Sequence, residues 1–254
     1  MPGARWLKRG LLQRFRPPAR TRASSLPPPV AADLAAPLRD HVRLRLVQHV
    51  DDTYSGIPMQ KLPEDLRCYE QLLWDARCNV VVELGSNHGG SALWFRDRLV
   101  TMATYGRIRS PKVIAIDVIA DRTEGELRTV DPLARHISFV QGDVLDPSLP
   151  DRVRAMLRPD DRVFVIEDTA HEHDTTLAAL EGFASMVPVG GYLVVEDTVV
   201  DQDDLRVDPE WPRGVAPAIA EWLATPGGAG FEIDRRLELY GVTCHPGGFL
   251  RRMS

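Results

Sequence analysis

The stretch that decides the fold is VVVELGSNHGGS, residues 80–91. Its first five residues, apolar apart from one glutamate, predict a strand at 80–84, which Gly85 interrupts at once. A helical pattern over 91–99 follows the glycines. An almost wholly apolar strand that leads through a glycine loop into a helix is typical of a parallel sheet covered by helices on both faces.

The same alternation continues on both sides of this stretch. Further strands are expected at 112–117, 137–140, 162–166 and 191–195, and helices at 41–49, 63–76, 149–157, 175–186 and 215–224. Two closing strands, 231–237 and 241–252, have no helix between them and predict an antiparallel hairpin. We therefore expect a single α/β domain over 39–254, a doubly wound and mostly parallel sheet of about seven strands with an antiparallel edge hairpin and N-terminal helices.

Composition and charge exclude several classes of protein. The chain has 254 residues, of which 44% are hydrophobic and 26% charged, so it is neither disordered nor fibrous as a whole. The net charge of −5 divides unevenly, because the first 32 residues hold seven of the 31 basic residues and none of the 36 acidic ones. The acidic remainder predicts no nucleic-acid binding, since phosphate neutralisation supplies most non-specific affinity.

Residues 1–38 are expected to form a basic, proline-rich tail. This tail is either a solvated leader or a short basic amphipathic helix that docks on a partner subunit or an anionic membrane surface. No continuous apolar stretch follows its charges as in a signal peptide, and no run approaches the roughly 20 apolar residues that span a bilayer. The widely spaced Cys68, Cys78 and Cys244 make neither a disulfide framework nor a zinc site, so a cytoplasmic location is expected.

Small and acidic residues follow the first three strands of the predicted sheet, where such sheets bind ligands. Gly85, Gly89 and Gly90 let the backbone approach a ligand, but their spacing fits neither the dinucleotide motif G-x-G-x-x-G nor a P-loop. Asp117 could accept both ribose hydroxyls of a nucleoside, and Asp143 could accept from an adenine amino group. S-adenosylmethionine, a nucleoside without a pyrophosphate, fits this description. Ordinary turn formation at strand ends is the alternative.

The fourth and fifth predicted strands also end in acids, Asp168 and the pair Glu196-Asp197. Neighbouring strands lie about 4.8 Å apart, so these three carboxylates would converge. A hard divalent ion, Mg²⁺ or Ca²⁺, removes the cost of their repulsion, whereas the alternative is that the acids cap the helices that follow. His171 is either a base or acceptor-site residue or a helix-start histidine without a catalytic role. A zinc site with His173 is rejected, because histidines two apart point to different sides of a helix.

Together these residues resemble the cephalosporin hydroxylase/rhamnosyl O-methyltransferase family of S-adenosylmethionine-dependent methyltransferases. The resemblance covers roughly residues 50–252 and rests on short motifs in a fixed order. The motifs are LPED at 62–65 with Tyr69 and LLW at 72–74, ELGS at 83–86, GGSA at 89–92, IAID at 114–117, DTAH at 168–171, VED at 195–197 and PGGFL at 246–250. One departure is Glu167, which stands where an apolar residue is expected.

This resemblance implies a Rossmann-like methyltransferase fold and assigns roles to the motifs. The methyl donor would bind at the glycine loop, which comprises Glu83, Gly85, Ser86, Gly89, Gly90 and Ser91. The acids that match the family's Mg²⁺ ligands are Asp168, Glu196 and Asp197. Members of the family methylate sugar hydroxyls of glycosylated natural products or assist in cephalosporin methoxylation.

We therefore expect an S-adenosylmethionine-dependent, Mg²⁺-assisted O-methyltransferase whose partner is a hydroxylated small molecule, a sugar or a glycosylated natural product. Metal coordination would lower the pKa of the acceptor hydroxyl, and His171 is the candidate to take its proton. A catechol acceptor and a non-catalytic cofactor-binding subunit that partners an oxygenase are the alternatives. An NAD(P)-dependent oxidoreductase is disfavoured because G-x-G-x-x-G is missing. The resemblance and the apolar-basic tail favour a homo-oligomer.

Overall fold

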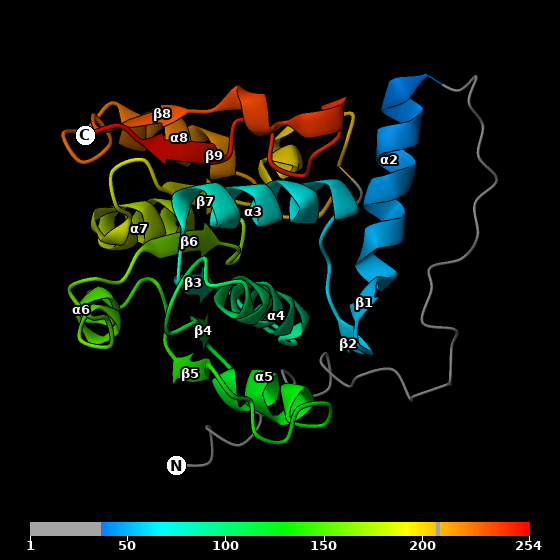
Figure 1. The fold of residues 1–254 in the computed structure, drawn as a ribbon. Coiled ribbons are helices and arrows are strands. Elements are labelled where there is room, and N and C mark those ends of the chain that lie inside the picture. Colours follow the sequence, from blue (N-terminus) through cyan, green and yellow to red (C-terminus); the bar gives the residue numbers. More distant parts are fainter. Residues whose placement is uncertain (1–36, 207–208) are drawn as a thin grey trace, which may run out of the picture.

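The computed structural model describes residues 37–206 and 209–254 (Figure 1). Within these residues its centre is a seven-stranded sheet in the order β5-β4-β3-β6-β7-β9-β8. The strands are β3 (Val80–Leu84), β4 (Lys112–Asp117), β5 (Ile137–Gln141), β6 (Val163–Glu167), β7 (Tyr192–Val195), β8 (Phe231–Ile233) and β9 (Phe249–Arg252). The first five in spatial order are parallel, whereas β9 is antiparallel to both β7 and β8. The doubly wound sheet with an antiparallel edge hairpin is confirmed.

Helices cover both faces of the sheet (Figure 1). One face carries α3 (Pro63–Ala76), α4 (Gly90–Thr104) and α5 (Ala120–Leu127), and the other carries α6 (Leu149–Arg154), α7 (His173–Phe183) and α8 (Val215–Leu223). The side chains of β3 alternate between them: Val81 packs in the core of the first face, whereas Val80 and Val82 pack in that of the second. This two-sided cover explains why all five residues of β3 are buried.

The strand order reverses between β3 and β6. From β3 the chain runs outward through β4 to β5, then crosses to the other side of β3 for β6 and β7. The register pairs Leu84 of β3 with Ile116 of β4 and Glu167 of β6, so the loops after these strands begin at the same level. This edge of the sheet is where doubly wound folds bind their ligands.

Short elements surround the sheet. They are α2 (Leu38–Gln48), η1 (His49–Asp51), the small hairpin of β1 (Thr53–Tyr54) and β2 (Ile57–Pro58), η2 (Ala184–Met186) and η3 (Thr198–Asp201). The sequence pattern did not predict the hairpin or α5, because two-residue strands have no periodicity and α5 contains Gly125 and few apolar residues. α2 packs through Val42 and Leu46 against Leu62 and Val199.

The closing strands are shorter than predicted. β8 ends at Ile233 and β9 begins at Phe249, whereas strands were expected over 231–237 and 241–252. The Asp234 side chain accepts the backbone N–H of Arg236 at 3.2 Å and starts the 3₁₀ turn η4 (Arg235–Leu237), which η5 (Leu239–Gly241) follows. A local side-chain hydrogen bond thus replaces strand pairing in this segment.

Three other predictions concern the chain as a whole. The predicted tail, 1–38, lies outside the described residues up to residue 36, and α2 begins at Leu38. Each of the described helices is too short or too polar to cross a membrane. Cys68, Cys78 and Cys244 are buried free thiols, as their spacing predicted.

Candidate functional site

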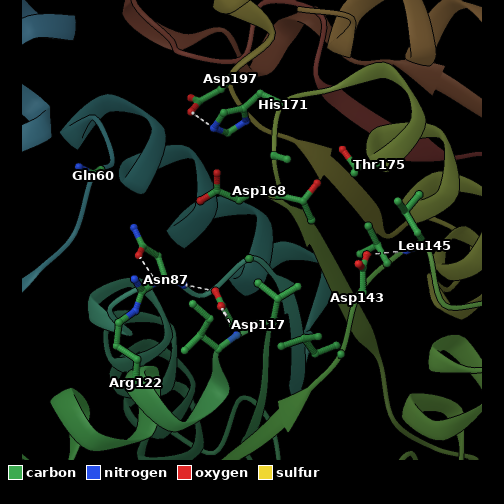
Figure 2. A pocket seen from close by; sticks show the side chains of 18 residues that line it. Gln60, Asn87, Asp117, Arg122, Asp143, Leu145, Asp168, His171, Thr175 and Asp197 are labelled. Atoms are coloured by element: carbon green, nitrogen blue, oxygen red, sulfur yellow. Dashed lines mark hydrogen bonds and ion pairs between the residues drawn. The ribbon is translucent and has the colours of Figure 1, made fainter. Parts of the chain in front are cut away.

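A cavity of about 420 Å³ opens beyond the carboxyl ends of the parallel strands (Figure 2). Its walls come from the loops after β3, β4, β5 and β6, and Asp197 adds a side chain from the loop after β7. The predicted site residues that line it are Gly85, Asp117, Asp143, Asp168, His171 and Asp197. The cavity therefore joins the predicted nucleoside site to the predicted acid cluster.

Gly85 brings the loop after β3 against the loop after β6. Its φ of +92° lies in the left-handed region, and an added Cβ would overlap the Asp168 carbonyl group, 2.6 Å from the carbonyl carbon. Gly90, at the start of α4, would bring a Cβ within 2.9 Å of the Met59 side chain. Gly89 also has a left-handed φ, +89°, and like Gly90 lies behind the cavity wall. These glycines are required for backbone packing, and Gly85 is the one that reaches the cavity.

Glu83, near the end of β3, is a buried carboxylate without a hydrogen-bond partner among the described residues. Burial raises the pKa of Glu83 to about 7, against the lowering effect of the nearby Lys61 ammonium. The buried hydroxyl of Ser86 also lacks a partner in the described structure. Ser86 and Ser91 line a hollow of about 30 Å³ that shares Gly85 with the main cavity. The glycine loop thus presents unpaired polar groups next to the cavity.

Asp117 lies at the end of β4, with 9% of its surface exposed. Its Oδ2 accepts the backbone N–H of Asn87 and its Oδ1 that of Ile119, each at 2.8 Å (Figure 2). Each oxygen keeps a second lone pair for a ligand. Asp117 therefore holds the two loops in place and can still accept a hydroxyl.

Apolar side chains rise from the two loops on this side of the cavity. Val118 and Ile119 follow β4, Leu145 follows β5, and all three are exposed. Asp143 accepts the backbone N–H of Leu145 at 2.9 Å through Oδ1 (Figure 2). Solvent-exposed apolar side chains around one carboxylate suit a flat aromatic base with an amino group.

Asp168, His171 and Asp197 form the acid cluster of the cavity (Figure 2). One ligand atom of each lies within 4.8 Å of the others, and His171 Nε2 is 3.4 Å from Asp197 Oδ2. His171 and Asp197 both have left-handed backbone angles, with φ of 59° and 55°. The Asp197 side chain makes no capping hydrogen bond to η3, and α7 has no side-chain cap either. The capping interpretation of these acids is therefore wrong.

Glu167 does not compete with Asp168 for the cavity. It is buried, and its carboxylate accepts the hydroxyl of Thr169 at 2.5 Å and that of Thr176 at 3.4 Å. Consecutive residues at a strand end point in opposite directions, so Asp168 faces the cavity and Glu167 faces away.

Glu196 lies beside the cluster and has partners of its own. Its Oε2 accepts from the Lys61 ammonium at 2.6 Å, and its Oε1 accepts from the Tyr69 hydroxyl at 2.7 Å. Lys61 also donates to Asp168 Oδ2 at 2.9 Å. The three predicted metal ligands are therefore not equivalent: Asp168 and Asp197 share the cavity with His171, while Glu196 is joined to Asp168 through Lys61.

These contacts shift the pKa values of the buried groups. Burial alone would raise the pKa of Glu196, but the Lys61 ammonium holds it below its usual value. Burial raises the pKa of Asp168 well above its usual range, and the carboxylates of Glu196 and Asp197 add to the shift in spite of Lys61. A cation bound beside Asp168 would offset both the desolvation and the repulsion from the neighbouring carboxylates.

A buried polar network supports the cluster from behind. His245, 2% exposed, accepts the backbone N–H of Asp197 at 2.9 Å through Nδ1, so its Nε2 carries the proton. That Nε2 lies 2.9 Å from the Tyr69 hydroxyl, which in turn donates to Glu196. No role in the site was predicted from the sequence for Lys61, Tyr69 or His245. Tyr69 fell on the apolar stripe of α3 and was therefore expected in the core. The signal available for Lys61 was the rarity of lysine in this chain, which has three, at 8, 61 and 112.

Comparison with known proteins identifies the family of the chain. The family model "Rhamnosyl O-methyltransferase/CmcI" matches residues 47–253. The rhamnosyl O-methyltransferase of Mycobacterium leprae is 29% identical over 208 residues, covering 79% of this chain and 82% of its own length. That of Mycobacterium bovis is 27% identical over 206 residues, covering 79% and 78%.

Solved structures show the same fold. An apo form of CmcI superposes with a TM-score of 0.58 at 24% identity and covers 89% of each chain. A CmcI structure with Mg and SAM gives 0.57 at 24% identity, covering 90% of each, and an O-methyltransferase from Bacillus cereus with SAH gives 0.51 at 15%, covering 78% of this chain and 84% of its own. The Rossmann-like fold and the predicted family are confirmed. The chain belongs to the Rhamnosyl O-methyltransferase/CmcI family of O-methyltransferases.

Proposed function

We infer that the protein is an S-adenosylmethionine-dependent, Mg²⁺-assisted O-methyltransferase that acts on a hydroxyl of a sugar or a glycosylated natural product. The observation that carries this proposal is the shared cavity, which Asp117 lines on one side and Asp168, His171 and Asp197 on the other, with Gly85 at the contact between their loops. A methyl donor and the acceptor hydroxyl must meet in one space, because in-line transfer needs the reacting atoms near 3 Å apart. Family membership supports the same reaction.

The residues around the glycine loop fit the donor. The unpaired Glu83 carboxylate behind the loop suits the positive charge of an amino-acid end. Asp117 keeps lone pairs for the two ribose hydroxyls, and the exposed Val118 and Leu145 suit an adenine ring, whose amino group Asp143 would accept. A Cβ at Gly85 would overlap the Asp168 backbone in the wall of the cavity.

The acid cluster fits a hard cation. Asp168 and Asp197 supply carboxylate oxygens within 4.8 Å of each other, and Glu196 adds a third carboxylate on the Lys61 side. Mg²⁺ prefers oxygen ligands, so we assign the metal to these three acids and leave the His171 imidazole as the base.

Bound S-adenosylmethionine supplies the methyl group, and bound Mg²⁺ supplies the charge that lowers the pKa of an acceptor hydroxyl. The chain's own residues do the rest. His171 lines the cavity with its Nε2 3.4 Å from Asp197 Oδ2, and this Nε2 is the atom that would accept the hydroxyl proton. A sugar is the acceptor class because the matched relatives are named rhamnosyl O-methyltransferases.

Calorimetry and a chelator test this function together. We expect S-adenosylmethionine and S-adenosylhomocysteine to bind and labelled methyl to pass to rhamnosylated acceptors, with turnover lost in chelator and restored by Mg²⁺. Asp197→Asn should keep donor affinity while the rate falls by about 10²-fold or more, because a charged metal ligand is lost. Unchanged turnover in excess chelator would remove the metal from the reaction, and absent donor binding would favour a non-catalytic subunit. Transfer to a catechol alone would replace the sugar.

A further inference from the structure

Lys61 is a buried cation at the edge of the acid cluster. Its side chain is 2% exposed, and its ammonium lies 2.6 Å from Glu196 Oε2 and 2.9 Å from Asp168 Oδ2. Few lysines are buried this completely, because removing an ammonium from water costs several kcal/mol unless carboxylates compensate. The two carboxylates supply that compensation, so the three groups form one unit.

The backbone around Lys61 fixes the position of the ammonium. Its N–H donates to the Met59 carbonyl at 3.1 Å, and the next residue, Leu62, is 1% exposed and leads directly into α3. Gly90 of α4 packs closely against the 58–59 segment, where an added Cβ would overlap Pro58. Lys61 is therefore held between two helices that cover the same face of the sheet.

Tyr69 fixes the other half of the unit. Its hydroxyl binds Glu196 Oε1, so both oxygens of this carboxylate have partners. Oδ2 of Asp168 accepts a hydrogen bond from Lys61. On the cavity side, the same carboxylate belongs to the cluster with His171 and Asp197. Asp168 thus connects the internal cation to the place where a metal would bind.

The charges of this arrangement are complementary to a divalent ion. When Asp168, Glu196 and Asp197 are all ionised, their three negative charges exceed the single positive charge of Lys61, and the buried Glu83 adds to the negative potential around the ammonium, so the site favours a divalent cation. The residue type also fits: an ammonium is a compact point charge like a metal ion, whereas guanidinium is planar and extended. Lysine is used here although 28 of the chain's 31 basic residues are arginine.

We propose that Lys61 is a positioning residue that acts as a resident cation of the metal site. It holds Asp168 and Glu196 together when no metal is bound, and its charge weakens Mg²⁺ binding, so that the ion exchanges readily. This inference rests on the proposed function only in the identity of the ion. It assigns to Lys61 no proton transfer and no contact with substrate.

Metal affinity of charge variants tests the proposal. Lys61→Met removes the charge at similar length and should bind Mg²⁺, or Mn²⁺ as a probe, at least about tenfold more tightly by calorimetry, because a like charge is gone from a low-dielectric site. Glu196→Gln should bind at least about tenfold more weakly, and the double variant Lys61→Met/Glu196→Gln should return to within about threefold of wild type. The matched control is Lys112→Met, because Lys112 starts β4, donates to the Met156 carbonyl at 2.9 Å and lies at the other end of the sheet.

Thermal unfolding gives a second readout. Metal-free Lys61→Met should have a lower Tm than wild type and regain it with Mg²⁺, since the carboxylates of the buried Glu196 and the half-buried Asp168 then lack a cation. If Lys61→Met does not fold, the double variant and Glu196→Gln still decide: the double variant must bind metal more tightly than Glu196→Gln. Affinity that is unchanged or weaker in Lys61→Met overturns the role of Lys61 while wild-type Mg²⁺ binding leaves the proposed function standing. If Lys61→Met binds Mg²⁺ and the wild type does not, the role of Lys61 as a resident cation is supported and the metal-assisted reaction is refuted. If neither protein binds Mg²⁺, both proposals are refuted.

Discussion

Replacing Gly85 by alanine should destabilise the protein and disturb the acid cluster in one step. A residue with a Cβ at a φ of +92° pays about 1–2 kcal/mol for the left-handed backbone. The added methyl would also overlap the backbone after β6, 2.6 Å from the Asp168 carbonyl carbon and 3.1 Å from the Thr169 nitrogen. Overpacking against backbone costs about 1–3 kcal/mol more, so we expect a loss of about 2–5 kcal/mol in the free energy of unfolding.

Gly190→Ala is the control for the backbone term alone. Gly190 has a φ of +79°, and an added Cβ there meets nothing within 4 Å. Its variant should lose only about 1–2 kcal/mol in urea unfolding, with the m-value unchanged in both. Because the overlap moves the backbone of Asp168, Gly85→Ala should also weaken Mg²⁺ and donor binding, whereas Gly190→Ala should leave both intact. Equal stability losses, with ligand binding preserved, would refute the close contact between the two loops.

Three further substitutions separate the roles within the cavity. Asp117→Asn should lower S-adenosylmethionine affinity by at least about tenfold in calorimetry, because charge-assisted hydrogen bonds of about 1.5–3 kcal/mol are lost, and unchanged affinity would place the ribose elsewhere. Burial raises the pKa of Glu83 from 4.5 to about 7, so between these pH values the folded chain holds a proton that the unfolded chain has lost. The free energy of unfolding of the wild type therefore falls as the pH rises from 4.5 to 7. Glu83→Gln should lack this fall, gaining about 3 kcal/mol over wild type between pH 4.5 and 7 in denaturant titrations, and parallel pH profiles would contradict it. His171→Asn should slow turnover by about 10²–10⁴-fold with Mg²⁺ affinity preserved, whereas an equal loss of metal affinity would make His171 a ligand.

The fold was predictable because its signals are local. Apolar runs such as 80–84 and the stripe of α3 repeat within a few residues, and Gly85 marks the turn between strand and helix by itself. At Asp234 a hydrogen bond from a side chain to the nearby backbone determines the local structure. The alternation of apolar residues was misleading there, and the strand predicted over 231–237 ends too late.

The site was predictable in part, for a related reason. Acids at strand ends drew attention to Asp168, Glu196 and Asp197, but the alternation of side chains gives Glu196 different surroundings from the other two. Glu196 continues the strand, its N–H donating to the Glu167 carbonyl at 2.8 Å, and so points toward Lys61 and Tyr69. Asp197 turns into the left-handed region and returns to the cavity. Pairing across more than a hundred residues leaves no pattern within a single sequence.

The buried network behind the cluster affects the order in which the protein folds. Lys61 and Glu196 are 135 positions apart, Tyr69 and Glu196 127, and Tyr69 and His245 176. Such distant pairs form late, since the loops between them must close before any contact is gained. During folding, α3 and β3 can form before β7 and the segment around residue 245. At that stage the carboxylates of the metal site are not yet assembled. Metal capture during refolding should accordingly lag behind the recovery of helical signal and report the last cooperative step.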